Sequence, residues 1–104
     1  MARYRKKPVE IEAVQWWVNG DHPEDGHPEH EGRVVRYFRH PDPEYAGDKL
    51  HEPCSRIWHV HGWIDTLEGG HTVCPGDWIV TGVQGERYPV KPDIFAATYE
   101  AVTD

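Results

Sequence analysis

Short alternations of hydrophobic and polar residues recur along this chain, and a period of two residues is typical of half-buried β-strands. In the segment 9–18, Val9, Ile11 and Ala13 fall on one face, and the parity of the hydrophobic positions changes after Ala13. This break predicts a strand with a bulge. The spacing of residues 33–39 also fits a helical stripe, but their β-branched and aromatic content favours a short strand.

The best-patterned segment is 57–66, where hydrophobic residues alternate with histidines. His59 and His61 would share one face of a strand, with their side chains roughly 6 to 7 Å apart. Residues 67–70 predict a turn, after which the chain returns as a partner strand. With a four-residue turn, Cys74 lies on the His61 face and His71 lies on the opposite face, whereas a one-residue bulge would exchange them.

Tight turns separate the elements that follow. The sequence CPGD at 74–77 predicts a type II turn, because its proline fixes φ at the second position and its glycine allows a positive φ at the third. A strand at 78–83 and a glycine turn lead to another extended segment at 86–90. A short helix is predicted to begin at Pro92, and residues 99–102 would close the sheet as a last strand.

Two long polar segments, 19–32 and 40–53, are rich in proline, glycine and acidic residues, and they predict loops. The whole pattern predicts one domain covering residues 1–104. Its fold class is mainly β: a small, strongly bent antiparallel sheet or barrel with one short C-terminal helix and long polar loops.

Composition narrows the range of functions. The 104 residues carry a formal net charge of -7, and the basic residues cluster only at Arg3, Arg5, Lys6 and Lys7, which argues against nucleic acid as a partner. The chain contains no apolar stretch of the length that a membrane helix or a signal peptide requires. We therefore expect no membrane association and a location in the cytosol of the cell.

One group of residues carries candidate metal chemistry. Five potential ligands fall within a short stretch of chain: Cys54, His59, His61, His71 and Cys74. Thiolate and imidazole are the donors that Zn²⁺ prefers in tetrahedral protein sites. Their spacing differs from that of a zinc finger or knuckle, and eight histidines are spread along the chain, so a set of ordinary polar histidines is the alternative. Zinc is therefore the candidate cofactor, and if a metal binds here, the pattern favours a structural over a catalytic role.

Other catalytic patterns are incomplete. Ser55 is the only serine and lies in no nucleophile elbow, and a pair of Cys74 and His61 lacks a recognisable oxyanion donor. The chain contains more aromatic residues than a small core can bury, and Trp17 and Trp63 are the candidates for contact with a partner.

Several short, distinctive motifs follow one another near the two ends of the chain. These are RYRKKPVEIEAVQWW at the start, and PGDWI, GVQGE, YP, KPDIF and TYE in the C-terminal part. In these motifs the chain resembles a family of small uncharacterised proteins of tailed phages and prophages. The resemblance implies a phage origin and a shared fold, and it implies no catalytic residue. The segment from Val18 to Arg56 lies outside it.

Three functions remain open at this point. The leading hypothesis is a non-enzymatic phage accessory protein that binds a host or phage protein, or a small molecule, through its aromatic and loop surface. The second is a zinc-dependent enzyme that uses the His59/His61 face with Glu68 or Asp65 as a base. The third is a component of the virion or of its assembly. The sequence leaves the oligomeric state open.

Overall fold

The computed structural model describes residues 1–5, 7–27, 29–38, 50, 51, 54, 56, 57 and 60–102. Its first sheet contains three antiparallel strands in the order β1-β7-β8. These strands are β1 (Glu12–Gln15), β7 (Trp78–Thr81) and β8 (Arg87–Val90). Ile79 in the central strand lies opposite Val14 on one side and Pro89 on the other.

The second sheet has the order β2-β5-β6, and it is also antiparallel. It contains β2 (Arg36–Tyr37), β5 (Gly62–Thr66) and β6 (Gly69–Val73). The strands β5 and β6 form a hairpin in which Thr66 pairs with Gly69 across a two-residue turn. At the other end of the hairpin Gly62 pairs with Val73.

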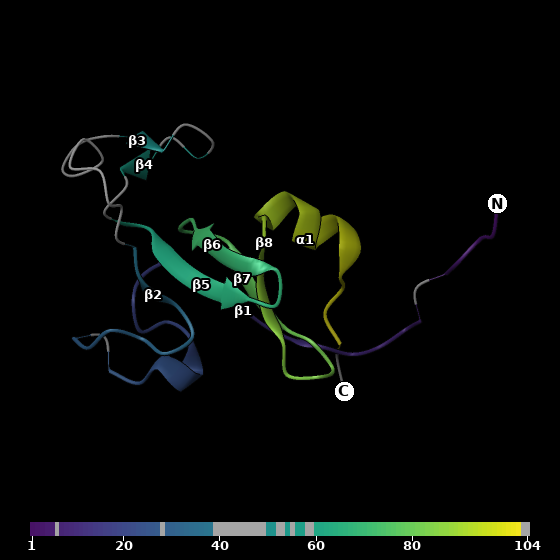
Figure 1. Cartoon of the computed structure of the whole chain (residues 1–104), viewed down its shortest axis with the longest axis horizontal. Coiled ribbons are helices and arrows are strands. Elements are labelled where there is room, and N and C mark those ends of the chain that lie inside the picture. The colour runs from purple at the N-terminus through teal and green to yellow at the C-terminus, as the bar shows by residue number, and fades with distance from the viewer. Residues whose placement is uncertain are drawn as a thin grey trace.

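Four short elements complete the described part of the chain. The strands β3 (Leu50–His51) and β4 (Arg56–Ile57) pair with each other, and Figure 1 shows them at one end of the molecule, near the start of β5. The 3₁₀-helix η1 spans Pro23–Asp25. The helix α1 spans Pro92–Thr98. Within the described residues, no helix has the length and apolar character needed to cross a membrane.

The hydrophobic core takes side chains from both sheets. Its buried members come from β5, β6, β7 and the ends of β1 and β2: Trp16, Val35, Ile64, Val73 and Ile79. The outer face of the first sheet is covered by α1, because the ring of Phe95 stacks on Trp78 with centroids 4.2 Å apart. The packing of the two sheets brings the end of β6, the start of β5 and the start of β7 close to Cys74.

The predicted fold class is confirmed. The described part of the chain is mainly β, with two three-stranded antiparallel sheets and one short C-terminal helix, and its sheets do not close into a barrel. The turn at 74–77, the glycine turn before β8 and the start of the helix at Pro92 are also as predicted.

The ends of several strands differ from the prediction. The first strand covers Glu12–Gln15 rather than 9–18, and its pairing with β7 is continuous, so it has no bulge. Pairing stops at Glu12 because β7 ends at Thr81, where the turn to β8 begins. The second strand is limited to Arg36–Tyr37.

The predicted strands at 57–66 and 99–102 are also corrected. The long strand begins only at Gly62, because Val60 lies in a 3₁₀ turn and Ile57 pairs in a different sheet. Residues 99–102 are not a strand. The ring of Tyr99 stacks on Phe95, and its hydroxyl lies 3.4 Å from that of Tyr88, which places it on the face of the first sheet rather than at its edge.

The polar segment 19–32 contains more structure than a loop prediction implies. Besides η1, it buries Asp25, whose two carboxylate oxygens accept the backbone N–H groups of Val34 and Val35 at 2.6 and 3.2 Å. This polar segment is thereby attached to the core through the start of the second sheet. In the other predicted loop, residues 40–49, 52 and 53 lie outside the described residues, and Leu50–His51 form β3.

Candidate metal centre

Cys74 directly follows β6, where the chain turns toward β7. The turn is type II, with Asp77 N–H donating to the carbonyl of Cys74 at 3.0 Å and Gly76 at a φ of 100°. A glycine is required at this third position because other residues rarely adopt a positive φ. The Trp16 N–H donates to the carbonyl of Asp77 at 2.8 Å, which fixes the turn beside the end of β1.

Asp77 and Lys91 surround the backbone of Cys74. The Asp77 carboxylate, whose side chain is 3% exposed, accepts the Cys74 N–H at 2.9 Å through Oδ2. The Lys91 ammonium donates to both oxygens of the same carboxylate, at 3.1 and 3.2 Å. Because a buried carboxylate is costly without partners, this arrangement holds Cys74, Asp77 and Lys91 as one unit.

His61 approaches Cys74 from the neighbouring strand. Since Gly62 pairs with Val73, continuing the register by one residue sets His61 opposite Cys74. Both residues are buried, with 4% of His61 and 2% of Cys74 exposed. Cys54 comes from the chain between β3 and β4 and is half-buried, and its Sγ lies 3.0 Å from Nε2 of His61.

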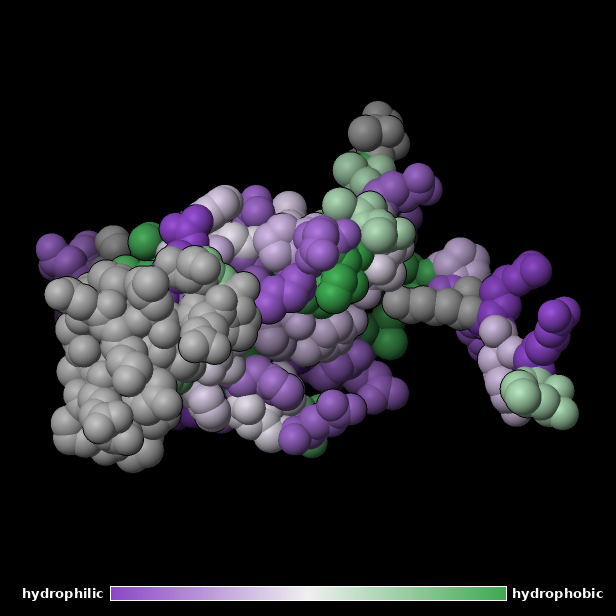
Figure 2. All heavy atoms as spheres, turned by 90° about the horizontal axis from the view of Figure 1, so that it is seen from above, coloured by the Kyte–Doolittle hydropathy of each residue, from purple (hydrophilic) through white to green (hydrophobic). Residues whose placement is uncertain are grey.

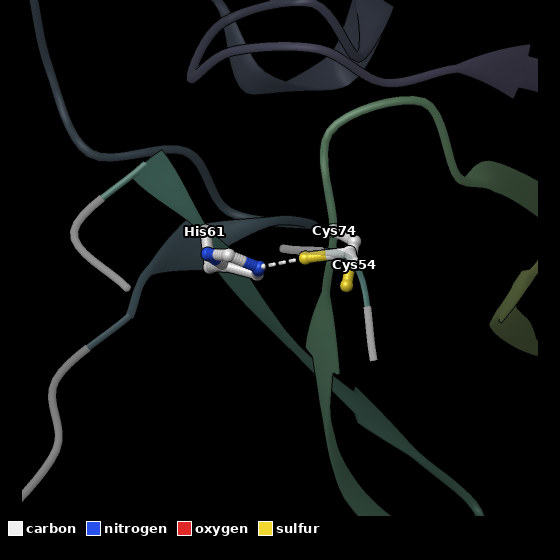
Figure 3. A group of neighbouring side chains, drawn as sticks. All are labelled: Cys54, His61 and Cys74. Carbon is white, nitrogen blue, oxygen red and sulfur yellow. Dashed lines mark hydrogen bonds between the residues drawn. The ribbon is translucent and has the colours of Figure 1, made fainter. Parts of the chain in front are cut away.

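The three residues form a group that can hold a metal ion. Their ligand atoms all lie within 4.8 Å of one another. Figure 3 shows the His61 ring pointing from the start of its strand toward the two sulfur atoms, which come from separate parts of the chain. Two sulfurs and one imidazole nitrogen are suitable donors for a tetrahedral metal ion, for which they would supply three of four ligands.

The surroundings of the group alter its acid–base behaviour. Burial raises the pKa of the Cys74 thiol to about 11, and it outweighs the Lys91 ammonium, which acts in the opposite direction. Burial by itself lowers the pKa of Lys91, but the hydrogen bonds to Cys74 and Asp77 outweigh burial and raise it. Without a metal, Cys74 is therefore a protonated thiol beside a charged ammonium, and a metal ion that binds there must displace the proton.

The structure brings together three of the five residues in the predicted metal set, namely Cys54, His61 and Cys74. His71 does not join them, because it pairs with Ile64 and is exposed on the other face of the sheet. There it lines a pocket of about 400 Å³ between the β5–β6 hairpin and β8. His59 lies outside the described residues.

The predicted faces of Cys74 and His71 are confirmed, although the residue pairs predicted for the hairpin are wrong. The observed register explains both results. A four-residue turn at 67–70 would pair His71 with Thr66, but the turn contains two residues, so His71 pairs with Ile64. A shift of two residues keeps every side chain on its face, whereas a shift of one would invert them. Cys74 accordingly lies on the same face as His61, and His71 lies on the opposite face.

The two tryptophans expected to contact a partner have different environments. Trp17 is 47% exposed, and its ring lies beside Gly76. Trp63 is half-buried, and its ring covers Gly70 while its Nε1 donates to Asp65 at 3.3 Å. Trp17 is therefore the more accessible of the two.

Sequence reasoning did not assign Asp77 and Lys91 to the site. A local signal exists for Asp77, because an aspartate that ends a four-residue turn can accept the N–H of the first residue. Lys91 gives no such signal, since it reaches Asp77 only through the pairing of β7 with β8.

No family model matches the chain, and no curated protein or solved structure matches it either. The resemblance to tailed-phage proteins therefore stays a prediction. The chemistry of the Cys54, His61 and Cys74 group is the firmest basis for a functional conclusion.

Proposed function

We propose that this protein is a non-enzymatic binding module of a tailed phage, in which a Zn²⁺ ion at Cys54, His61 and Cys74 attaches the β3–β4 segment to the two-sheet body. The observation that carries the proposal is the convergence of two sulfurs and one imidazole nitrogen within 4.8 Å. Zinc is the metal of choice because it favours thiolate and imidazole donors in tetrahedral geometry.

The balance of charge supports a metal cation. Two thiolates carry a charge of about -2, and the burial of His61 and Cys74 leaves little water to stabilise that charge. A divalent cation neutralises it, while the neighbouring Asp77 and Lys91 neutralise each other. The site can therefore hold Zn²⁺ without leaving an uncompensated charge in the protein interior.

The positions of the carboxylates favour a structural over a catalytic ion. Asp65 forms an ion pair with Arg36 and accepts the Trp63 Nε1–H. Glu68 lies in the turn at the far end of the β5–β6 hairpin from His61. Both carboxylates lie several residues along the hairpin from His61. Neither is therefore placed to act as a base on a water bound to this ion.

The metal content of untagged protein tests the zinc part of the proposal. We expect close to one equivalent of zinc by plasma mass spectrometry, and loss of most of it in the variants Cys54→Ser and Cys74→Ser. His71→Ala is the matched control, because His71 is exposed on the other face of the same hairpin, and it should retain its zinc. Stoichiometry near zero in fresh wild-type protein would reject the site.

The exposed surface supports the binding part. On the face seen in Figure 2, hydrophobic spheres occur in small separate groups among hydrophilic ones. Trp17, an aromatic residue that is 47% exposed, is the side chain that we propose contacts the partner. Affinity capture from a bacterial host that carries the gene should recover a partner with the wild-type protein and less of it with Trp17→Ala. Equal recovery would exclude Trp17 as a contact.

A virion or assembly role is the alternative outcome. Mass spectrometry of purified particles decides it, since a binding module that acts in the cell should be absent from washed virions. Stoichiometric amounts of the protein in the particles would replace the accessory role with a structural one.

A further inference from the structure

Cys54 and Cys74 are both reduced in this structure, and their sulfur atoms lie within 4.8 Å of each other. A disulfide requires a sulfur–sulfur distance of about 2.05 Å, so the two atoms need to approach by at most about 3 Å. They belong to different segments, since Cys54 lies between β3 and β4 whereas Cys74 follows β6. A bond between them would connect the same two parts of the molecule as the proposed metal ion.

We propose that Cys54 and Cys74 form a peroxide-sensitive thiol pair, in which a disulfide and a bound Zn²⁺ exclude each other. The metal half of this switch rests on the proposed function, whereas the thiol half stands on the geometry of the two sulfurs and His61. The reactant is a hydroperoxide, and the products are the disulfide, the corresponding alcohol and water.

Exposure and contacts decide which cysteine reacts first. Cys54 is half-buried and its Sγ is hydrogen-bonded to Nε2 of His61 at 3.0 Å, whereas Cys74 is only 2% exposed. Peroxide therefore reaches Cys54 first. Cys74, whose backbone is fixed by Asp77, remains close by and supplies the second sulfur.

The reaction balances in two steps. The sulfur of Cys54 attacks the outer oxygen of the peroxide, the O–O bond breaks, and the thiol proton passes through Nε2 of His61 to the leaving oxygen, which gives an alcohol and a sulfenic acid. The sulfur of Cys74 then attacks that of Cys54. The S–O bond breaks, and the hydroxyl leaves with the Cys74 proton as water. Both sulfurs are oxidised, and the peroxide supplies the two-electron acceptor.

The consequence for metal binding follows directly. Once the disulfide forms, both sulfurs lose their thiolate character, and His61 remains as one ligand of the three. A single imidazole does not hold Zn²⁺ firmly, so oxidation releases the ion. Conversely, a bound Zn²⁺ occupies both sulfurs and slows their oxidation.

The first experiment treats metal-free, reduced protein with one equivalent of hydrogen peroxide and follows its intact mass without reductant. We expect a loss of two hydrogen atoms and one peptide pair linked through Cys54 and Cys74. In Cys74→Ser the reaction should stop at the sulfenic acid of Cys54, which a dimedone probe traps. In Cys54→Ser, labelling of the buried Cys74 should be at least tenfold slower. Absence of the disulfide, or equally fast labelling of both cysteines, would overturn the proposal.

The second experiment separates the role of His61 from general folding effects. In metal-free Cys74→Ser protein, where the sulfenic acid of Cys54 persists, an added His61→Gln substitution should slow dimedone labelling of Cys54 about tenfold or more, because the proton acceptor is lost. His71→Gln, added to Cys74→Ser in the same way, is the control and should leave the labelling rate unchanged. Equal rates in all three proteins would show that His61 takes no part in the step.

Zinc content, measured before peroxide is added, distinguishes failure of this proposal from failure of the proposed function. Disulfide formation in a protein that binds no zinc would reject the metal site and keep the thiol pair. Zinc binding without a disulfide in the metal-free protein would reject the thiol pair and keep the metal site. In zinc-loaded protein, release of the ion to a chromogenic chelator should follow disulfide formation one to one.

Discussion

At the scale of single residues, Asp77 connects the candidate site to the fold. Its buried carboxylate accepts the N–H of Cys74 and both contacts from Lys91, so it fixes the backbone that carries one ligand. A carboxylate in such a place stabilises the protein only while its partners are present. The site and the turn at the start of β7 therefore depend on one side chain.

We predict that Asp77→Asn lowers the free energy of unfolding by about 2 kcal/mol, because the hydrogen bonds lost to the ammonium and the turn involve a charged group. Urea unfolding of metal-free protein measures the change. Asp65→Asn is the matched control, since its ion pair with Arg36 is exposed and should contribute less than about 1 kcal/mol. Equal losses in both variants would contradict the structural role of Asp77.

The titration of Cys74 predicts a dependence of stability on pH. Its pKa is raised from 9.0 to about 11, first of all by burial, so the folded protein holds the thiol proton more tightly than the unfolded chain does. The stabilisation from this proton is complete below pH 9 and is lost as the pH rises toward about 11. The total change is on the order of 3 kcal/mol.

Urea unfolding of metal-free protein across this pH range checks the prediction against Cys74→Ser, which should lose less stability. The variant is needed because Tyr88 also titrates in alkali, its pKa being raised to about 12 by the hydrogen bond to Tyr99. If both proteins lose stability in parallel, the Cys74 thiol is not the responsible group.

At the scale of elements, the two faces of the β5–β6 hairpin have different roles. One face contributes Ile64 and Val73 to the core, while the other brings His61 close to Cys74. Glycines permit close packing on both sides. A Cβ atom at Gly62 would lie 2.5 Å from Cγ1 of Val35, and one at Gly70 would lie 2.0 Å from Cζ2 of Trp63.

The two glycines should respond differently to substitution by alanine. Gly62→Ala should cost about 1–3 kcal/mol, because Val35 is buried in the core and has no room to move. Gly70→Ala should cost less, because the half-buried Trp63 ring can turn outward, and the indole N–H resonance of Trp63 should shift as its contact with Asp65 is lost. Urea unfolding and nitrogen–proton spectra measure both effects. A larger loss in Gly70→Ala would contradict this picture.

At the scale of the whole molecule, the proposed ion links a small two-stranded unit to the body. The strands β3 and β4 pair only with each other among the described residues, and Cys54 lies between them in the chain. A pair of two strands by itself is only marginally stable and opens more readily than the central strand of a larger sheet. Metal binding would therefore stabilise this unit more than the central strand β7.

We predict that chelation of zinc accelerates amide exchange in β3 and β4 far more than in β7. With zinc at 100 times its dissociation constant, the linked unit gains roughly 2.7 kcal/mol, which corresponds to about a hundredfold slower exchange. Exchange measured by mass spectrometry with and without chelator tests this. A uniform change across the chain would mean that the ion stabilises only the global fold.

Some features of this protein follow from its sequence alone because they depend on near neighbours in the chain. The type II turn at 74–77 needs only proline and glycine at adjacent positions, and the helix start needs only Pro92. The face of Cys74 relative to His71 is also local, since it follows from alternation along one strand and survives a register shift of two residues.

Other features were decided only by tertiary structure, because they depend on segments far apart in the chain. The ends of β1 and β5 were misjudged, since a strand ends where its partner does, and no local pattern reveals the partner. Likewise, alternation along the chain groups His61 with His59, whereas in the structure His61 contacts Cys54 from the separate β3–β4 segment. Lys91 contacts Asp77 only because β7 pairs with β8. The sequence alone identifies cysteine and histidine as the candidate ligands. Which of these residues come together, and in what geometry, is determined by tertiary packing.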